Sequence, residues 1–585
     1  MRCAPALLLF LIAVVAHAAT SGGTVTVTVD TTKNVRPISP LIFGVAYGDA
    51  TRNAQMGYTV RRWGGNSTTR YNWQVDVHST AQDYYWENIP DCTAASCTGT
   101  PPAGNSADTF ITEAKMGGAQ PLIAIPTIGW TPRADSPHMH PYFAGFSVKK
   151  YGTQEPSNGN PAVDPYDTDA GSGECSPAHN TSPNCVLYDA DNNLYHLINN
   201  SPQDTSTAIT STFEKPWIAH LQSTFGTAAN GGVKMYSLDN EVMLWNSTHR
   251  DVHPIPPTYD EIWGKAAEYG AMIKTQDPDA LVTGPVTWGY PDLFSSAQDS
   301  ADCNCIQGST DRAHHGGLAF VAWYLQQVCA NPLAGGKHLV DYLDLHYYPQ
   351  GTNVALSDDD SAATAARRLK SLKEMYDSTW VSDSWIGSLG DDDSNHYDKP
   401  NLIPRVRAWI DQYCPGTKLA ITEYNWGNDN TNSGAVAQAE LLAIFAREGV
   451  DMATRWVAPD PSTKAERGYQ ILLNYDAAGS NVFGDSVAAT TSSIDQVGAY
   501  AFHGSGNAMV LLTNKDTVSH DVAVTFNSPH NATWTLYGFD SNNAVHMIAT
   551  GTITGSSLTI SGLTPISANL LVIPDNDEIF KNGFQ

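Results

Sequence analysis

Eight short apolar runs recur along the chain, and helical patterns lie between most of them. In the link after the fourth run, Thr258 and Glu261 are spaced as a capping box, and Ile262, Ala266 and Tyr269 follow on one helical face. Strand and helix alternating eight times predict an α/β fold, a (β/α)8 TIM barrel with its functional site at the carboxyl ends of the strands. The runs are residues 41–47, 59–63, 121–128, 233–238, 281–287, 339–348, 418–422 and 452–457.

Three segments depart from this repeat. The link at residues 48–58 is short for a full helix, and residues 133–212, rich in Asp, Asn, Pro, Gly and Ser, indicate a long insertion between the third and fourth strands. From about Ile494 the pattern changes to alternating strands without helices, which predicts a second, smaller all-β sandwich domain. Residues 24–29 alternate Thr and Val in the same style, so we expect them to pair with the C-terminal sheet.

The N-terminal residues read as a secretory signal. Arg2 precedes an apolar run at residues 6–15, and small residues precede a cleavage point after Ala18. No later run approaches the roughly 20 apolar residues of a spanning helix. We therefore expect a secreted, extracellular protein. The expected parts are a signal peptide at 1–18, a catalytic barrel at 36–475 with its insertion at 133–212, a sandwich at 19–35 plus 476–574, and a flexible tail at 575–585.

The remaining cysteines fit an exported chain. Without Cys3 there are eight, and two closely spaced pairs predict loop disulfides, Cys92 with Cys97 and Cys175 with Cys185. The other four, at positions 303, 305, 329 and 414, are left without assigned partners. C-x-x-C and H-x-x-x-H spacings are absent, so no zinc site is expected.

The formal charge of −27 argues against nucleic acid and anionic membranes as partners, because phosphate contacts require Lys and Arg. A neutral polymer is compatible with this charge. The chain also has 15 Trp and 26 Tyr residues, and such rings stack on the C–H faces of sugars. We expect a monomer that acts on a polysaccharide.

Two of the apolar runs end in a glutamate. The fourth leads into Asp239, Asn240 and Glu241, and the seventh leads into Glu423. The fourth and seventh strands of a barrel face each other, so their ends can bring two carboxyl groups to about 5 Å. Glycosidic hydrolysis needs such a pair, one to protonate the leaving oxygen and one at the anomeric carbon. A helix-capping Asn240 beside a solvated Glu241 is the alternative.

Four separated motifs resemble glycoside hydrolase family 44: VRRWGGN at 60–66 continuing to TRYNW at 69–73, SLDNE at 237–241, ITEYN at 421–425, and REGVD at 447–451 with ATRW at 453–456. The resemblance implies a barrel with a β-sandwich and endo-acting, retaining β-1,4-glucanase or xyloglucanase activity. By that resemblance Glu241 is the acid/base and Glu423 the nucleophile. Val242 departs from the family, which more often has Pro there.

Supporting residues are expected around the pair. Asn240 can hydrogen-bond the sugar 2-hydroxyl. Arg61 or Arg62 can orient Glu423, and strand alternation turns one of the two inward without saying which. A structural salt bridge or core packing is the alternative for each of the supporting residues. The further candidates are His346, Tyr348 and Tyr424 as hydrogen-bonding groups and Trp63 and Trp456 as stacking platforms.

No cofactor is required for this chemistry. The acidic stretches at residues 164–169 and 391–393 can bind structural calcium, with solvated loops as the alternative. The sequence thus predicts a secreted retaining endo-β-1,4-glucanase or xyloglucanase. The alternatives are a non-catalytic carbohydrate-binding barrel and a hemicellulase of other specificity, a mannanase or a xylanase.

Overall fold

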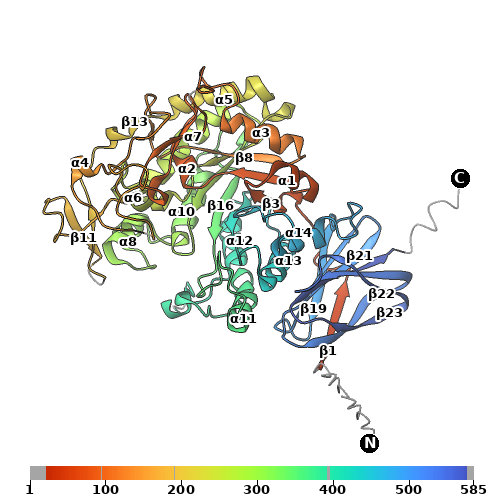
Figure 1. Ribbon diagram of the computed structural model, residues 1–585. Coiled ribbons are helices and arrows are strands. Elements are labelled where there is room, and N and C mark those ends of the chain that lie inside the picture. The colour runs from red at the N-terminus through yellow and green to blue at the C-terminus, as the bar shows by residue number, and fades with distance from the viewer. Residues whose placement is uncertain (1–20, 94, 158, 190–191, 392–394, 576–585) are drawn as a thin grey trace, which may run out of the picture.

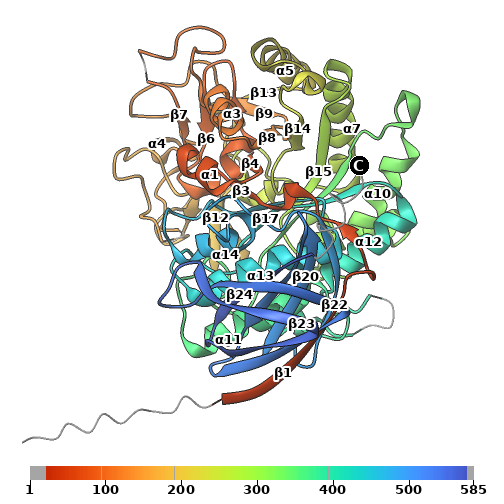
Figure 2. The ribbon, with the colours of Figure 1, turned by 90° about the vertical axis from the view of Figure 1, so that its right-hand side faces the viewer.

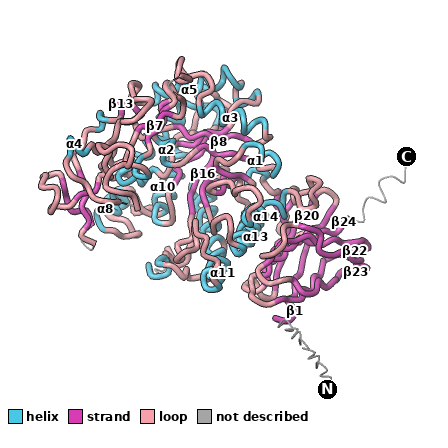
Figure 3. The backbone as a smooth tube through the Cα atoms, in the orientation of Figure 1, coloured by secondary structure: helices cyan, strands magenta, loops and turns pink. Residues whose placement is uncertain are grey.

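The computed structural model describes residues 21–575 apart from 94, 158, 190–191 and 392–394 (Figure 1). The predicted signal peptide, and the predicted tail beyond Asp575, lie outside the described residues. Two bodies are visible, a helix-covered barrel and a smaller body of strands, which stand apart in Figure 3. No helix in the described part of the chain has the length and apolar character needed to span a bilayer.

Eight parallel strands close into a barrel, which confirms the predicted TIM barrel. Each strand overlaps one of the eight predicted runs, because strands buried on both faces read as continuous apolar stretches. The strands are β3 (Gly44–Ala46), β4 (Val60–Trp63), β8 (Gln120–Ile125), β14 (Met235–Leu238), β15 (Leu281–Thr287), β16 (Tyr342–Tyr347), β17 (Lys418–Tyr424) and β18 (Met452–Arg455). In the order around the barrel, two strands, β15 and β16, lie between β14 and β17, so the ends of β14 and β17 meet across part of the barrel mouth.

Helices cover the barrel from outside (Figure 2). The longer ones are α3 (Ser106–Met116), α5 (Ser211–Phe225), α7 (Tyr259–Gln276), α10 (Phe320–Ala330), α11 (Ala362–Ser371), α12 (Leu402–Tyr413), α13 (Asn432–Glu448) and α14 (Lys464–Leu473). The shorter ones are α1 (Ala50–Met56), α2 (Asn66–Thr69), α4 (Val148–Tyr151), α6 (Trp245–Thr248), α8 (Ala297–Cys303) and α9 (Thr310–His314). The link at 48–58 therefore holds only the seven-residue α1.

The start of α7 differs in one detail from the prediction. Thr258 caps the helix by accepting a hydrogen bond from the backbone N–H of Glu261, as expected. The carboxylate of Glu261 instead contacts the Nε2 atom of His253 at 2.8 Å. Only half of the predicted capping box is present, because a nearer partner competes for the glutamate.

The insertion between β8 and β14 carries small sheets of its own. β10 (Glu174–Cys175), β12 (Leu194–Leu197) and β11 (Cys185–Asp189) form a three-stranded sheet, and β9 (Trp130–Pro132) pairs with β13 (Ser206–Ala208). A further small sheet, in the link between β4 and α3, contains β5 (Tyr71–Asn72), β6 (Val77–Ser79) and β7 (Asn88–Pro90).

The second body is an eight-stranded sheet that folds back on itself. β1 pairs with both β19 and β22, as expected for the alternating N-terminal segment, and an apolar core lies inside. One of the sheet's strands, β22, is long and runs without interruption through 21 residues. The strands are β1 (Ser21–Asp30), β2 (Arg36–Pro37), β19 (Asp485–Thr491), β20 (Val497–Gly504), β21 (Asn507–Asn514), β22 (Ser519–Phe539), β23 (His546–Leu563) and β24 (Ser567–Pro574). The boundary expected at residue 36 falls inside this sheet, because β2 pairs with β19.

A buried charge joins the two bodies. Glu440 lies in the middle of α13 and is fully buried. Its carboxylate accepts hydrogen bonds from Tyr500 at 2.9 Å and Thr513 at 2.7 Å, both in strands of the second body, and from Lys515 at 2.9 Å, directly after β21. These contacts satisfy a carboxylate that would otherwise be costly to bury.

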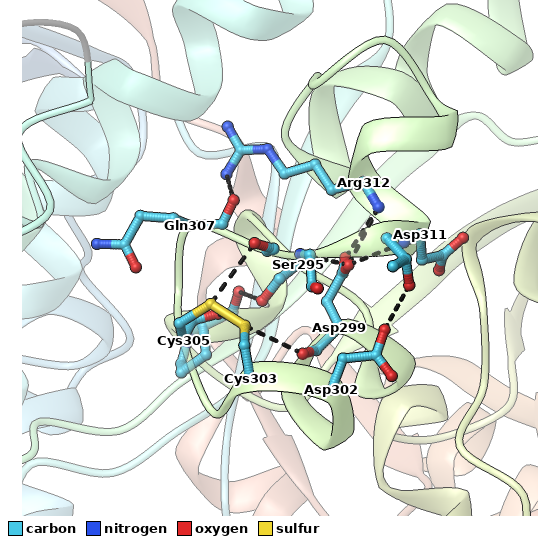
Figure 4. Close-up of a disulfide and its surroundings, with 12 residues drawn as sticks. Ser295, Asp299, Asp302, Cys303, Cys305, Gln307, Asp311 and Arg312 are labelled. Atoms are coloured by element: carbon cyan, nitrogen blue, oxygen red, sulfur yellow. Dashed lines mark hydrogen bonds between the residues drawn. A yellow bond between two sulfur atoms is a disulfide. The ribbon is translucent and has the colours of Figure 1, made fainter.

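Four disulfides are present among the described residues. Cys92–Cys97 and Cys175–Cys185 confirm the prediction. Cys329–Cys414 joins α10 to the end of α12, and Cys303 pairs with Cys305. Figure 4 shows the Cys303–Cys305 pair beside Asp299, whose carboxylate accepts hydrogen bonds from the backbone N–H groups of residues 309, 311 and 312 and so orders this loop.

Candidate active site

Glu241 and Glu423 meet at the carboxyl ends of the barrel strands. Glu241 follows β14 and Glu423 is the penultimate residue of β17. One carboxylate oxygen of each and a ring nitrogen of His346 all lie within 4.8 Å of one another. This separation is close to that of two carboxyl groups that act on the same bond.

Glu423 is fixed by two hydrogen-bond donors. The Nη1 atom of Arg62 donates to Oε1 at 2.5 Å, and the hydroxyl of Tyr348 donates to Oε2 at 2.8 Å. Arg62 is completely buried. Burial alone would lower its pKa, but the charges of Glu423 and Asp344 raise the pKa above its ordinary value. Arg62 is therefore a cation paired with Glu423 inside the barrel.

Asp239 holds in place the turn that carries Glu241. The buried carboxylate of Asp239 accepts hydrogen bonds from the backbone N–H groups of Thr127 at 2.6 Å, Ile128 at 3.0 Å and Asn240 at 2.9 Å. It thereby ties the end of β14 to the loop after β8. Glu241 itself adopts a left-handed backbone with φ of 46°, an uncommon conformation for a residue with a side chain.

The surroundings of Glu241 and His346 favour the neutral form of each group. Burial raises the pKa of Glu241 well above its usual range, and the charge of Glu423 raises it further. Burial, together with the charge of Arg62, lowers the pKa of His346 well below its usual value. The two groups form a hydrogen bond of 3.0 Å between Nδ1 of His346 and Oε1 of Glu241. The two glutamates thus differ in their surroundings, one beside a cation and one beside a neutral imidazole.

Asn240 is hydrogen-bonded to Arg62. Its Oδ1 atom accepts from Nη2 of Arg62 at 2.7 Å and from the backbone N–H of Gly65 at 3.2 Å. Its amide nitrogen faces Oδ1 of Asn66 at 3.4 Å. These contacts fix the orientation of the amide beside Glu241.

Three predicted supporting residues lie away from the pair. The side chain of Arg61 donates to the carbonyl of Gly48 at 2.9 Å and pairs with Glu113, outside the barrel. Trp63 is buried with its ring edge-on to Tyr71 and Trp217. Tyr424 is buried and its hydroxyl accepts from Gln438. Successive strand residues face opposite sides, so Arg62 and Glu423 point inward while Arg61, Trp63 and Tyr424 point outward.

Trp456 lies at the edge of the site. It is half-buried, edge-on to Tyr47 with ring centroids 5.9 Å apart, and its ring covers Gly65. A Cβ atom at residue 65 would lie 2.6 Å from the indole, so the close approach requires glycine. This packing holds the Trp456 ring against Gly65, whose backbone N–H bonds Asn240, and leaves part of the ring in solvent.

The sequence did not single out Asp344 or Trp385. Asp344 lies beneath His346 on the same face of β16, accepts from Thr283 at 2.6 Å and Thr422 at 2.7 Å, and has its pKa raised to about 6 by burial. Its position two residues before His346 was the available signal. Trp385 is 43 % exposed and is linked to Tyr348 through Gln350. The sequence pattern did not indicate where the side chains of the long segment around Trp385 lie.

A separate acidic cluster lies between the insertion and the link after β4. One ligand atom each of Glu87, His140 and Asp164 lies within 4.8 Å of the others. Glu87 is fully buried, neither of its carboxylate oxygens has a hydrogen-bond partner, and burial with the charges of Asp164 and Asp167 raises its pKa to about 8. The predicted stretch at 164–169 thus contributes to a cluster. In the other stretch, Asp391 contacts Lys399 and His396, and residues 392–393 lie outside the described part.

Comparison with known proteins gives consistent matches. The sequence profile described as glycoside hydrolase family 44 matches residues 77–351, which include Glu241. The fold superposes on CelM2, a bifunctional glucanase-xylanase from a metagenome library, with a TM-score of 0.84, 36 % identity, and coverage of 95 % of this chain and 100 % of that one. It superposes on a Paenibacillus polymyxa family 44 xyloglucanase with a TM-score of 0.73, 25 % identity, and coverage of 94 % and 100 %.

A curated relative is longer than this chain. The Caldicellulosiruptor saccharolyticus protein named beta-mannanase/endoglucanase A is 29 % identical over 543 residues, which cover 89 % of this chain and 36 % of the relative. The chain thus spans about a third of that protein's length. The profile match, the full-length structural similarity to CelM2 and the paired glutamates agree, and the chain belongs to glycoside hydrolase family 44.

Proposed function

We propose that this protein is a secreted, retaining endo-β-1,4-glucanase that accepts xyloglucan, with Glu423 as nucleophile and Glu241 as acid/base. The observation that carries the proposal is the approach of the two carboxylates to within 4.8 Å in unequal surroundings. Glu423 is paired with the cation Arg62, whereas burial and the charge of Glu423 raise the pKa of Glu241 well above its usual range. A site with one ionised and one protonated carboxyl group is ready for double displacement.

In the first step Glu241 donates its proton to the glycosidic oxygen as the bond to the anomeric carbon breaks. Glu423 attacks that carbon and forms a glycosyl ester. Arg62 and Tyr348 position the attacking carboxylate, and Asn240 is placed to hydrogen-bond the 2-hydroxyl. The leaving sugar departs with the proton.

The second step reverses the role of Glu241. Once Glu423 is an ester it carries no charge, so the repulsion that raises the pKa of Glu241 is removed. Glu241, now a carboxylate, takes a proton from water as the water oxygen attacks the anomeric carbon. Glu423 leaves as a carboxylate, and its charge restores the protonated state of Glu241 for the next cycle.

The names of the similar proteins support the proposed substrate. Two of the three proteins compared above are named for glucanase activity and one for xyloglucanase activity, which supports a β-1,4-glucan backbone. The same names include mannanase and xylanase, so hydrolysis of mannan or xylan is the second candidate. A non-catalytic carbohydrate-binding barrel is disfavoured by the intact pair. We also propose export through the N-terminal segment and a monomeric state.

The test is hydrolysis of a panel of polysaccharides by the parent and two variants. Glu241→Ala and Glu423→Ala should each lower turnover of xyloglucan and β-glucan by at least about a thousandfold. Circular dichroism should show both variants folded. The highest initial rate is expected on xyloglucan or mixed-linkage glucan, with mannan and xylan slower. Parent-like activity in either variant would remove the assignment.

We further propose that Glu87, Asp164 and Asp167 hold a structural calcium ion. Three features support it. The fully buried carboxylate of Glu87 has no hydrogen-bond partner, and one carboxylate oxygen of Asp164 has none either. The charges of Asp164 and Asp167 lie close to Glu87. Calcium prefers oxygen ligands and would neutralise this repulsion. It has no part in the chemical steps.

Calorimetric titration of chelator-treated protein with calcium chloride tests this site. Because the pKa of Glu87 is about 8, binding below that pH should displace a proton, so affinity should rise between pH 6 and pH 8. Glu87→Gln should abolish binding, while Asp391→Asn should leave it unchanged. Absence of binding heat and of any shift in Tm with calcium would overturn the proposal.

A further inference from the structure

The insertion carries a groove outside the catalytic pair. It has a volume of about 650 Å³ and lies between the three-stranded sheet of β10, β11 and β12 and the preceding segment around Glu155. Tyr188, Tyr195 and Leu194 line it together with Glu155, Glu174 and His179. The Cys175–Cys185 disulfide joins β10 to β11 beneath it. The groove is thus part of a cross-linked sheet.

One aromatic ring in the groove is presented flat to solvent. Tyr188 is 49 % exposed, and its ring stacks on His196 at 4.5 Å with an interplanar angle of 10°. Burial, with the charge of Arg250, lowers the pKa of His196 to about 4, so the imidazole is neutral at physiological pH. A ring supported from behind by another ring loses little freedom on binding, which favours a ligand with a flat apolar face.

Polar groups surround that ring. Glu155 contacts Nδ1 of His179 at 2.5 Å, and Glu174 accepts from Nη2 of Arg250 at 3.0 Å. Carboxylates with one side engaged can still accept hydrogen bonds from hydroxyl groups. The chain's charge of −27 opposes an anionic polymer at this surface. An apolar face edged by hydroxyl groups is the surface of a neutral sugar.

Arg250 connects the groove to the catalytic residues. It lies nine positions after Glu241 and donates to the carbonyls of Leu197 at 2.7 Å and Gly173 at 2.8 Å, which lie side by side where β12 and β10 pair. Its guanidinium also lies over the rings of Trp86 and Phe146. The groove therefore has a fixed position relative to the segment that carries the acid/base.

We propose that this groove is a second polysaccharide-binding site, which holds a neutral β-glucan segment on Tyr188 while another part of the polymer occupies the catalytic site. The inference rests on the proposed function for the identity of the polymer. The groove takes no part in bond cleavage. Its effect is to raise the local concentration of polymer near the catalytic pair.

Affinity electrophoresis in native gels containing xyloglucan tests the proposal. A Glu241→Gln background prevents hydrolysis, and saturating cellotetraose occupies the catalytic site. Retardation should persist in this background and should weaken about three- to tenfold on adding Tyr188→Ala. Tyr188→Phe, which keeps the ring, should retain it. Tyr166→Ala removes an exposed tyrosine of the same insertion outside the groove, and should also leave retardation unchanged.

Kinetics separate this inference from the proposed function. Otherwise parental Tyr188→Ala should keep kcat/KM on an aryl cellobioside and raise KM on xyloglucan by a similar three- to tenfold factor. Retardation that Tyr188→Ala leaves unchanged, or that Tyr166→Ala reduces equally, overturns the second site even if the parent hydrolyses β-glucan. Retardation that depends on Tyr188 in a protein without hydrolytic activity would overturn the proposed function and keep the groove.

Discussion

At the scale of single residues, Arg62 organises the site. One nitrogen of its guanidinium bonds Glu423 and another bonds Asn240, so a single rigid fork sets the positions of Glu423 and of the amide next to Glu241. Its neighbour Arg61 has the same chemistry but bonds Gly48 and Glu113 on the outside of the barrel. Adjacent residues thus have unrelated roles because the strand turns them to opposite faces.

Arg62→Lys should therefore be far more harmful than Arg61→Lys. A lysine carries the charge but cannot bond both partners in the fork geometry, so kcat/KM on β-glucan should fall about a hundredfold or more. Arg61→Lys, as the matched control, should stay within about threefold of the parent. Equal losses in the two variants would show that Arg62 acts only through the fold.

In the proposed mechanism the protonation of Glu241 sets the alkaline side of the activity profile. Activity requires the protonated form, and because burial and Glu423 raise its pKa, activity should persist well above the ordinary glutamate range and fall as pH passes the raised pKa. Glu241→Ala on a dinitrophenyl cellobioside, whose leaving group needs no proton, should lose this alkaline fall in kcat/KM. An unchanged alkaline limb in that variant would assign it to another group.

At the scale of elements, α13 couples the barrel to the second sheet. Nearly all of its residues are buried, and Glu440 near its centre forms the buried ion pair with Lys515, directly after β21. The pair is shielded from water, unlike most ion pairs on the surface. Removal of one partner therefore leaves the other charge buried without compensation.

Lys515→Met should destabilise the protein by about 3–5 kcal/mol in denaturant unfolding, because Glu440 would remain buried without its cation. Lys33 provides the control: its side chain is 74 % exposed and pairs with Asp30. Lys33→Met should change the free energy of unfolding by less than about 1 kcal/mol. Comparable effects from the two substitutions would mean that α13 and the sheet separate before global unfolding.

At the scale of the whole molecule, the charge of −27 governs which polymers approach. On carboxymethyl cellulose, repulsion should lower kcat/KM at low ionic strength, and raising sodium chloride from about 10 to 200 mM should increase it several-fold by screening. On uncharged xyloglucan the same salt range should have little effect. The same increase on both polymers would point to a cause other than charge.

The sequence predicted the barrel because its strands are buried on both faces and appear as apolar runs. It also located Glu241 and Glu423, since strand order brings the ends of their strands together across part of the barrel mouth. The sequence could not show which of Arg61 and Arg62 points into the barrel, because alternation says only that the two side chains point to opposite faces of the strand. Cys329–Cys414, separated by 85 positions, required the packing of α10 against α12. His140 and Asp164, which cluster with Glu87, likewise come from loops distant in sequence.

The central claim is that Glu241 and Glu423 act on one bond by double displacement. Proton NMR of the first product released from a reduced cellooligosaccharide or xyloglucan oligosaccharide, recorded before mutarotation, tests it most directly. The account predicts the β-anomer as the initial product, because two successive displacements restore the configuration. An initial α-anomer would contradict it, since it would require a single displacement by water between two carboxylates that approach within 4.8 Å.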